Sequence, residues 1–340
     1  REGNQKELGE MVKKAKENLA TRYSYQSRYY GDVNELKVSI LDKTVIPHQV
    51  EVQPGPIGGD ICWLKCPYCY GHTAQDSGER LTPERYVEIM TQIAEGGVKK
   101  VIFAGYATDP LFYNHIEDIV QVALDYNQIT GFHTKAINIS DRLAKQITAA
   151  SIAPLSYFSI SVDSGNNETY NKVHGVPQSQ AKLYDKVIAN ISKLVEERSK
   201  TDAPLDISAT YLLNPLNNSS DEVLKSIHDL RNAGVDLIRF TFPQVPRGYS
   251  VNTNDPNIPS KDQITEYMKR LRPLIEKEND SQCQVLILDL DGMHDVYEVP
   301  RSLPCFARYI FPSIGFDGWL SHCSESAAPH FRGLAMGNLQ

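Results

Sequence analysis

Hydrophobic positions along this chain alternate between short apolar runs and longer stretches in which apolar residues recur every three to four positions. The short runs predict strands, and they lie at residues 48–52, 101–104, 131–134, 157–162, 206–213 and 237–242. A stretch with helical spacing follows each run, at residues 83–95, 116–124, 141–150, 181–197, 221–233 and 261–276. Such alternation is typical of parallel strands that are crossed over by helices. We therefore predict an α/β fold, a partial (β/α)6 TIM-like barrel.

The two ends of the chain differ from this repeating part. We predict that residues 1–45 form a charged, helical N-terminal extension and that residues 46–300 form the barrel. The run at residues 285–288 resembles one further strand, after which the sequence becomes irregular and rich in Gly, Pro and aromatic residues. We expect a domain boundary near Pro300, with residues 301–340 as a small irregular C-terminal extension.

Composition and charge narrow the class of protein. The chain has 340 residues, of which 41% are hydrophobic, so it can bury a large core without disulfide bonds. Its formal net charge of -7 argues against a broad grip on nucleic acid, which needs clustered Lys and Arg. No apolar run approaches the roughly 18 residues that span a bilayer. We expect a cytoplasmic protein that contacts neither a membrane nor a nucleic acid.

Three of the six cysteines, Cys62, Cys66 and Cys69, lie within eight residues, in the loop that follows the first predicted strand. Disulfide frameworks belong to short secreted domains, and clustered thiols in a reducing compartment indicate a metal instead. Three thiolates are one ligand short of the four that close a structural zinc site. His72 could supply the fourth ligand, because Cys69-x-x-His72 has a usable spacing. A zinc-stabilised α/β binding protein is therefore the alternative to a site that keeps one position open for chemistry.

Parallel barrels place their chemistry at the carboxyl ends of the strands. The segments that follow the predicted strands are candidates for that reason alone, and they are residues 62–69, 105–109, 135–138, Asp163, Asn214, Arg247, Asp289 and Asp291. The first loop carries no glycine-rich phosphate-binding fingerprint, which argues against a dinucleotide-binding or phosphate-loop fold.

The spacing Cys62-x-x-x-Cys66-x-Tyr68-Cys69, in the loop after the first strand of a six-unit α/β barrel, resembles the radical S-adenosylmethionine superfamily. The resemblance implies that the three thiolates hold a four-iron four-sulfur (4Fe-4S) cluster whose fourth iron binds S-adenosylmethionine. An electron from the cluster then cleaves the sulfonium, giving methionine and a 5'-deoxyadenosyl radical that abstracts hydrogen from the substrate. The resemblance covers about residues 46–290 and also implies an electron donor such as flavodoxin or ferredoxin.

The same resemblance implies cofactor contacts for five residues of this chain. Tyr68, the aromatic residue before the third cysteine, corresponds to one that packs near the adenine. Asp109 stands where the family has the acid of Gly-Gly-Glu-Pro, although the paired glycines are missing here. Ser161 and Asp163 match a Ser-x-Asp segment whose hydroxyl bonds the ribose or carboxylate of the cofactor. His174 replaces the arginine of an Arg-Gly pair, which makes it a candidate carboxylate partner.

The spacing of Cys305 and Cys323 resembles the start of a SPASM or twitch extension, which binds auxiliary iron–sulfur clusters. The resemblance implies an auxiliary 4Fe-4S cluster, and we expect residues 301–340 to be a truncated form of that extension. Two thiolates alone cannot complete the usual four-ligand shell of such a cluster. A pair of ordinary buried or surface thiols is the alternative.

Cys283, Asp289 and Asp291 are weaker catalytic candidates. Some relatives that invert stereocentres use a lone thiol as a hydrogen-atom donor, although a small core residue ahead of the strand is the more ordinary interpretation of Cys283. Asp289 and Asp291 lie at the exit of that strand and could orient or deprotonate a polar substrate. Solvated carboxylates are the commoner outcome for such residues.

These features together predict a radical S-adenosylmethionine enzyme of the SPASM or twitch type. About 45 residues precede the barrel, and no winged-helix peptide-recognition domain is evident among them. This favours a small polar substrate, such as an amino sugar or a cyclitol, and an oxidation or epimerisation. Radical modification of a ribosomally made peptide is the closest alternative, because eighteen tyrosines could line a peptide groove. An RNA-modifying enzyme conflicts with the acidic charge.

Overall fold

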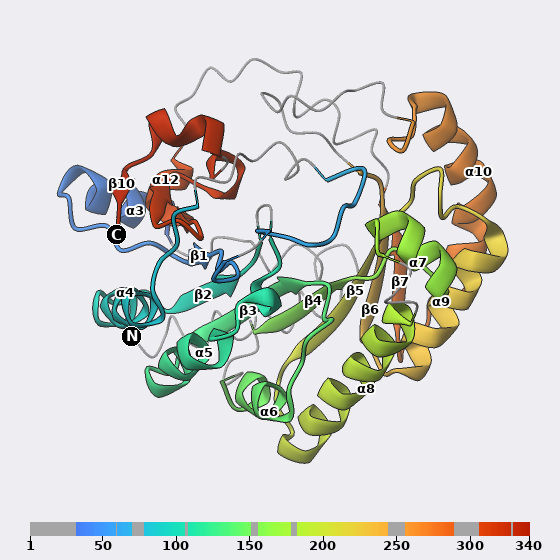
Figure 1. The fold of residues 1–340 in the computed structure, drawn as a ribbon, viewed down its shortest axis with the longest axis horizontal. Coiled ribbons are helices and arrows are strands. Elements are labelled where there is room, and N and C mark those ends of the chain that lie inside the picture. Colours follow the sequence, from blue (N-terminus) through green and yellow to red (C-terminus); the bar gives the residue numbers. More distant parts are fainter. Residues whose placement is uncertain are drawn as a thin grey trace.

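The computed structural model describes residues 32–58, 60–69, 78–105, 108–150, 156–177, 182–243, 256–288, 306–327 and 329–340. In this part of the chain a single ten-stranded sheet carries the fold, in the order β10-β9-β8-β1-β2-β3-β4-β5-β6-β7. Figure 1 shows the strands β1 to β7 as an arc with helices along its outer side. The order leaves β7 and β10 as the two edges of the described sheet, so the barrel is partial, as predicted.

Strands β1 to β7 are parallel, and each neighbours the next strand in chain order. Their bounds are β1 Val50–Val52, β2 Lys100–Phe103, β3 Ile129–Thr134, β4 Tyr157–Ser161, β5 Asp206–Leu212, β6 Leu237–Thr241 and β7 Gln284–Ile287. The six predicted strands are confirmed, and the apolar run at residues 285–288 is a seventh. All carboxyl ends therefore meet at one end of the sheet.

Helices follow the strands as the hydrophobic spacing predicts. Those along the outer side of the sheet in Figure 1 are α4 Pro83–Glu95, α5 Ile116–Asp125, α6 Asp141–Ala150, α8 Leu183–Thr201, α9 Ser220–Asn232 and α10 Lys261–Lys277. The other described helices are α3 Val33–Leu41, α7 Asn167–His174 and α12 Ala307–Ile310, with the short 3-10 helices η3 Pro110–Phe112, η5 Ser324–Ser326 and η6 Pro329–Leu334. None of the helices in the described ranges is long and apolar enough to cross a membrane.

Local sequence sets the helix ends. The Thr82 hydroxyl caps α4 by accepting a hydrogen bond from the Arg85 backbone N–H at 3.2 Å, and the helix ends at Gly96, as predicted. The periodicity does not reveal α7, which has only eight residues. This helix begins at an Asn166 cap and ends at Gly175, whose backbone is left-handed. The missed helix matters because its C-terminal end lies against the cysteine loop.

The two faces of the sheet differ in burial. Side chains that point outward to the helices are fully buried, as at Phe103, Phe132 and Phe158, and they belong to the main hydrophobic core. The inner face carries polar side chains instead, among them a half-buried Arg239 and an exposed His133. The main core therefore lies between sheet and helices, whereas the concave inner face is more polar.

The C-terminal segment joins the same sheet. Its strands are β8 Ser313–Ile314, β9 Trp319–Ser321 and β10 Gly337–Asn338. β8 pairs in parallel with β1, and β9 and β10 continue from it in antiparallel fashion. Residues 289–305, which include the expected boundary near Pro300, lie outside the described residues, as do residues 1–31 of the N-terminal extension. The predicted division into domains therefore stays a prediction.

Candidate functional site

The three clustered cysteines lie in the connection that follows the carboxyl end of β1, where the barrel topology places chemistry. Cys66 is buried, whereas Cys62 and Cys69 are half-buried. The Cys69 backbone N–H donates to the Cys66 carbonyl oxygen at 3.0 Å, which closes a tight turn between the two. The cysteine loop, residues 60–69, thus presents three sulfur atoms over a short span, with one of them anchored in the core.

The chemistry of these thiols fits an iron–sulfur cluster. Burial raises the pKa of Cys62 to about 11 and the pKa of Cys66 to about 12, and neighbouring thiols add to both shifts. Such thiols stay protonated at neutral pH until a metal replaces the proton, because coordination deprotonates a thiol outright. Among the described residues no three His, Cys, Asp or Glu side chains form a ready-made site for a single metal ion. His72, the predicted zinc ligand, lies outside those residues.

His174, the last residue of α7, supports the cysteine loop. Its ring is fully buried, with Nδ1 3.2 Å from Cys66 Sγ and Nε2 3.3 Å from the Val162 carbonyl oxygen. A carbonyl oxygen only accepts hydrogen bonds, so Nε2 donates and Nδ1 accepts from the thiol. The His174 carbonyl oxygen accepts from the Lys65 backbone N–H at 2.9 Å. All of these contacts join His174 to other residues of the protein. Its contact with the carboxylate of the cofactor stays a prediction.

A buried ion pair lies beside the loop. Lys135, directly after β3, donates from Nζ to Asp163 Oδ2 at 2.8 Å, and the Tyr68 hydroxyl donates to the same oxygen at 2.8 Å. Asp163 Oδ1 accepts from the Leu212 backbone N–H at 2.7 Å. The Asp163 side chain is fully buried and that of Lys135 is 15% exposed. The network ties the cysteine loop to the carboxyl ends of β3, β4 and β5.

Electrostatics keep both members of this pair charged. Burial alone would raise the pKa of Asp163, but Lys135 holds it below its ordinary value. Burial opposes the charge on Lys135 as well, yet Asp163 raises the pKa of Lys135 above its ordinary value. Asp163 and Ala136 both have a φ of 55°, a conformation that costs non-glycine residues about 1–3 kcal/mol. Both residues lie two positions after a strand, at the carboxyl end of the sheet that carries the cysteine loop.

Asp109 is engaged in the fold on both carboxylate oxygens. Oδ1 accepts from the Leu111 backbone N–H at 2.9 Å and from the Thr134 hydroxyl at 2.7 Å, and Oδ2 accepts from the Lys135 backbone N–H at 2.5 Å. Burial raises the pKa of Asp109. The residue therefore joins the loop after β2 to the end of β3 and positions Lys135. Its contact with the amino group of the cofactor stays a prediction.

The segment after Ser161, which is half-buried at the end of β4, is held by Glu222 of α9. Glu222 Oε1 accepts from the Gly165 backbone N–H at 2.6 Å and from the Ser164 hydroxyl at 3.1 Å. A Cβ at Gly165 would overlap the Glu222 carbonyl oxygen, so the contact requires glycine. Sequence patterns missed both Glu222 and Lys135 as individual residues. A glutamate in the first turn of a helix looks the same whether it faces water or a neighbouring loop.

Cys283 is not part of this site. It lies at the amino end of β7, with 3% exposure, and its backbone N–H donates to Asp280 Oδ1 at 2.9 Å. The cysteine loop is at the carboxyl ends of the strands. The strand direction puts Cys283 at the opposite end of the sheet, in the position of the small core residue that is the alternative interpretation, and its hydrogen-donor role stays a prediction.

The remaining predictions concern the C-terminal segment. Cys323 is half-buried after β9, and its backbone N–H donates to the Ser326 hydroxyl at 3.2 Å. Cys305, Asp289 and Asp291 lie outside the described residues. The auxiliary cluster and the two catalytic carboxylates therefore stay predictions.

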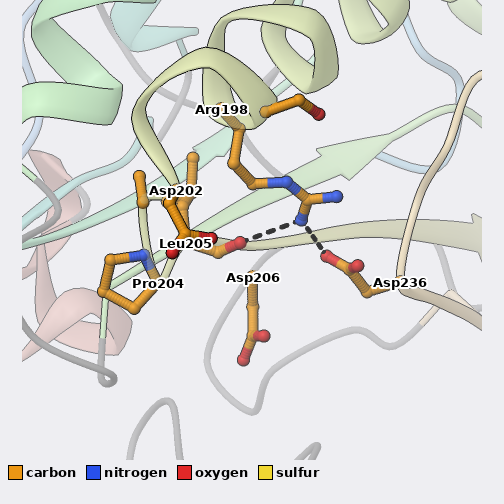
Figure 2. Close-up of a pocket in the computed structure, with 8 residues that line it drawn as sticks. Arg198, Asp202, Pro204, Leu205, Asp206 and Asp236 are labelled. Atoms are coloured by element: carbon orange, nitrogen blue, oxygen red, sulfur yellow. Dashed lines mark hydrogen bonds and ion pairs between the residues drawn. The ribbon is translucent and has the colours of Figure 1, made fainter.

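A cavity of about 250 Å³ lies at the amino ends of β5 and β6, away from the cysteine loop. Figure 2 shows Arg198, near the end of α8, pointing between the Leu205 carbonyl oxygen, at 2.9 Å, and the Asp236 carboxylate. Asp236 Oδ2 also accepts from the Ile207 backbone N–H at 2.8 Å. These contacts bind α8 to the starts of two strands, so the polar groups of this cavity serve the fold.

Comparison with known proteins gives consistent sequence matches. A family model described as the Radical SAM superfamily matches residues 57–204. A probable GTP 3',8-cyclase of Methanosarcina mazei is 25% identical over 257 residues, which are 68% of this chain and 73% of that protein. A PqqA peptide cyclase of Bradyrhizobium diazoefficiens is 25% identical over 167 residues, which are 49% of this chain and 40% of that protein.

Solved structures share the fold. SuiB of Streptococcus suis bound to the precursor peptide SuiA matches with a TM-score of 0.58 and 14% identity, over 86% of this chain and 63% of SuiB. The chain thus spans less than two thirds of SuiB. The structure of anSMEcpe with AdoMet and the Kp18Cys peptide matches with a TM-score of 0.56 and 17% identity, over 86% of this chain and 78% of that one. At these identities the likeness concerns the fold alone.

Proposed function

The chain belongs to the radical SAM superfamily, and on that premise we propose that Cys62, Cys66 and Cys69 hold a 4Fe-4S cluster at which S-adenosylmethionine is cleaved. The resulting radical takes a hydrogen atom from a small polar substrate. The cluster and S-adenosylmethionine are the cofactors of this superfamily. The observation that carries the proposal is the cysteine loop itself, which lies at the carboxyl end of the strands and is anchored by His174 and by the Lys135–Asp163 pair.

Each of the residues that surround the cysteine loop has a physical task in this scheme. When bound, the cluster supplies the single electron that cleaves the sulfonium. The His174 carbonyl oxygen anchors the loop at the Lys65 backbone N–H, and Tyr68 ties the loop to Asp163. Lys135 places a positive charge next to the thiols, which favours their deprotonated, metal-binding form. Asp163 pairs with Lys135 and so fixes the position of that positive charge. The same ion pair keeps the Asp163 carboxylate ionised.

The substrate is proposed from the polar character of the inner face of the sheet. A polar face suits a polar substrate, because buried polar groups need hydrogen-bonding partners. The relatives are named for GTP and for the PqqA peptide, and both are named cyclases, which favours ring closure as the outcome after hydrogen abstraction. Those names lend no support to an amino sugar or cyclitol, or to an epimerisation. A peptide substrate is the second candidate, favoured by the peptide-bound neighbours SuiB and anSMEcpe.

Anaerobic reconstitution with iron and sulfide tests the proposal. We expect about four iron atoms and four sulfides per chain, and 5'-deoxyadenosine on addition of reductant and S-adenosylmethionine. Cys66→Ala is expected to abolish 5'-deoxyadenosine, and Cys283→Ala, the matched control at the opposite end of the sheet, is expected to retain it. Undiminished turnover in Cys66→Ala, or one colourless zinc ion per chain in place of iron, would contradict the proposal and favour a zinc-stabilised binding protein.

A further inference from the structure

Three tyrosine hydroxyls in the described part of the chain are buried without a hydrogen-bond partner, and they belong to Tyr86, Tyr113 and Tyr170. A buried hydroxyl without a partner costs free energy, because it has lost its hydrogen bonds to water. Tyr86 and Tyr113 pack against each other, with ring centroids 5.0 Å apart. Tyr170 lies elsewhere, on α7, whose C-terminal end lies against the cysteine loop. Its surroundings therefore differ from those of the other two tyrosines.

The ring of Tyr170 is one contact away from the Cys66 sulfur. It packs edge-on against the His174 ring, with centroids 4.3 Å apart and an interplanar angle of 66°. His174 Nδ1 in turn lies 3.2 Å from Cys66 Sγ. Burial raises the pKa of Tyr170 well above its ordinary value, and negative charge on Cys66 raises it further. The hydroxyl thus keeps its proton at neutral pH and lies within the electrostatic reach of the Cys66 sulfur.

Coordination of a metal changes which hydrogen bonds Cys66 can make. As a thiol, Cys66 donates to His174 Nδ1, because Nε2 of that ring carries the proton that it donates to the Val162 carbonyl oxygen. Coordination removes the thiol proton, and the bound sulfur then only accepts hydrogen bonds. His174 Nδ1 carries no proton in this tautomer and cannot donate to it. The Tyr170 hydroxyl, in contrast, is a donor that the protein leaves unused nearby.

We propose that the Tyr170 hydroxyl donates a hydrogen bond to the Cys66 sulfur when the cluster is bound. The inference rests on the proposed function and adds a residue that sets the redox properties of the same site. Hydrogen bonds to the sulfur atoms of a cluster tune its reduction potential. A donor stabilises the reduced cluster more than the oxidised one, because the reduced cluster is the more negative. Tyr170 therefore raises the potential and takes no part in hydrogen abstraction from the substrate.

Tyr170→Phe, in the full-length, anaerobically reconstituted protein, tests this role. With iron in excess we expect a native iron content and a midpoint potential that is more negative than that of the native chain. In competition with a chelator we expect the apparent affinity for iron to fall about tenfold. Tyr113→Phe is the matched control, because it removes an equally buried hydroxyl without a partner, whose charged neighbours are Asp118 and Glu84. We expect the control to keep the native potential and affinity.

Two further measurements distinguish a bond to sulfur from a role in the fold. Electron–nuclear double resonance of the reduced cluster, in H2O and in D2O, is expected to show an exchangeable proton in the native chain and in Tyr113→Phe that is missing in Tyr170→Phe. Without iron, Tyr170→Phe is expected to be at least as stable toward urea as the native chain, because the lost hydroxyl has no partner.

The outcomes separate this inference from the proposed function. A native potential in iron-loaded Tyr170→Phe, an unchanged proton signal, or a loss of stability in the iron-free variant overturns the role of Tyr170 and leaves the proposed function intact. If the native chain forms no iron–sulfur cluster, the proposed function is wrong, and the role of Tyr170 is wrong with it.

Discussion

Lys100 and Lys135 are buried lysines at opposite ends of the neighbouring strands β2 and β3, and their surroundings differ. Lys135 lies 2.8 Å from Asp163, whereas Lys100 Nζ lies 5.5 Å from the centroid of the Tyr157 ring. Although burial opposes it, Asp163 raises the pKa of Lys135, while burial lowers the pKa of Lys100 to about 8. The carboxyl end of the sheet therefore stabilises a buried charge, and the amino end keeps one at a cost in free energy.

The ion pairs at the two ends show what separates a functional end from a structural one. At the amino end, Arg198 and Asp236 also bond backbone groups of β5 and its approach, which fastens a helix to the sheet. At the carboxyl end, Lys135 and Asp163 lie beside three thiols, and Asp163 has a strained backbone. Burial and pairing are common to both ends. The thiols distinguish the functional one.

Removing the carboxylate at each end tests this distinction most strongly. Asp163→Ala leaves Lys135 as an unpaired buried cation, so we expect the free energy of unfolding to fall by about 3–5 kcal/mol. We also expect loss of iron binding, because Tyr68 loses its acceptor. Asp236→Ala is the matched control, and it is expected to lower stability while leaving iron content and 5'-deoxyadenosine formation intact. Urea unfolding and iron analysis measure both. If both variants lose iron equally, the ion pairs at the two ends of the sheet do not differ in their effect on iron binding.

His174→Ala is expected to have the next largest effect. It removes the contacts of the His174 ring with the Val162 carbonyl oxygen and with the Cys66 sulfur and opens a cavity, so we expect a loss of about 2–4 kcal/mol in unfolding free energy. Because the Cys66 position is no longer fixed, we also expect a lower iron content and a shifted midpoint potential of the cluster. His228→Ala, at an exposed position of α9, is the control. An unchanged potential in a folded, iron-loaded His174→Ala would argue against a supporting role.

Gly175→Ala tests the helix end that carries His174. Gly175 has a φ of +57°, and a Cβ there would lie 2.6 Å from the Lys65 carbonyl oxygen. We expect a loss of about 1–2 kcal/mol from the left-handed backbone alone, together with slower iron incorporation as the loop is displaced. At Gly333 a Cβ meets no atom within 4 Å, so Gly333→Ala is the matched control. If iron is incorporated as fast in Gly175→Ala as in the control, the end of α7 does not influence the position of the cysteine loop.

Much of the fold could be predicted from the sequence because periodicity is a local signal. The apolar runs of β1 to β7 and the helical spacing of α4, α5, α6, α8, α9 and α10 are strong over their length. The eight residues of α7 are too few for that signal, and the pairing of β8 with β1 joins residues more than 250 positions apart. No local pattern predicts such a contact.

The candidate site could be predicted only as far as its motif extends. The spacing of Cys62, Cys66 and Cys69 identifies the loop, but nothing in it reveals that His174 lies against Cys66, 108 positions away. Lys135 fell within a predicted range, yet its pairing with Asp163 depends on the register of β3 against β4. Strand direction, in contrast, is a local signal: a residue before a strand lies at the amino end of the sheet, and Cys283 does so.

Lys100→Met offers the finest test of the contrast between the two lysines. The folded chain has a Lys100 pKa of about 8, below the ordinary 10.5, so the unfolded chain binds this proton more readily. The charge therefore destabilises the fold below pH 8, and the penalty disappears as the pH rises from about 8 to 10.5. We expect Lys100→Met to raise the unfolding free energy by about 2–3 kcal/mol at pH 7 and by less at pH 10. Lys135→Met is expected to act in the opposite direction at pH 7, because it strands Asp163 as a buried unpaired charge. Urea unfolding of both variants at the two pH values measures this. The prediction is wrong if Lys100→Met is less stable than the native chain by the same amount at pH 7 and pH 10. In that case Lys100 stabilises the amino end of the sheet as Lys135 stabilises the carboxyl end.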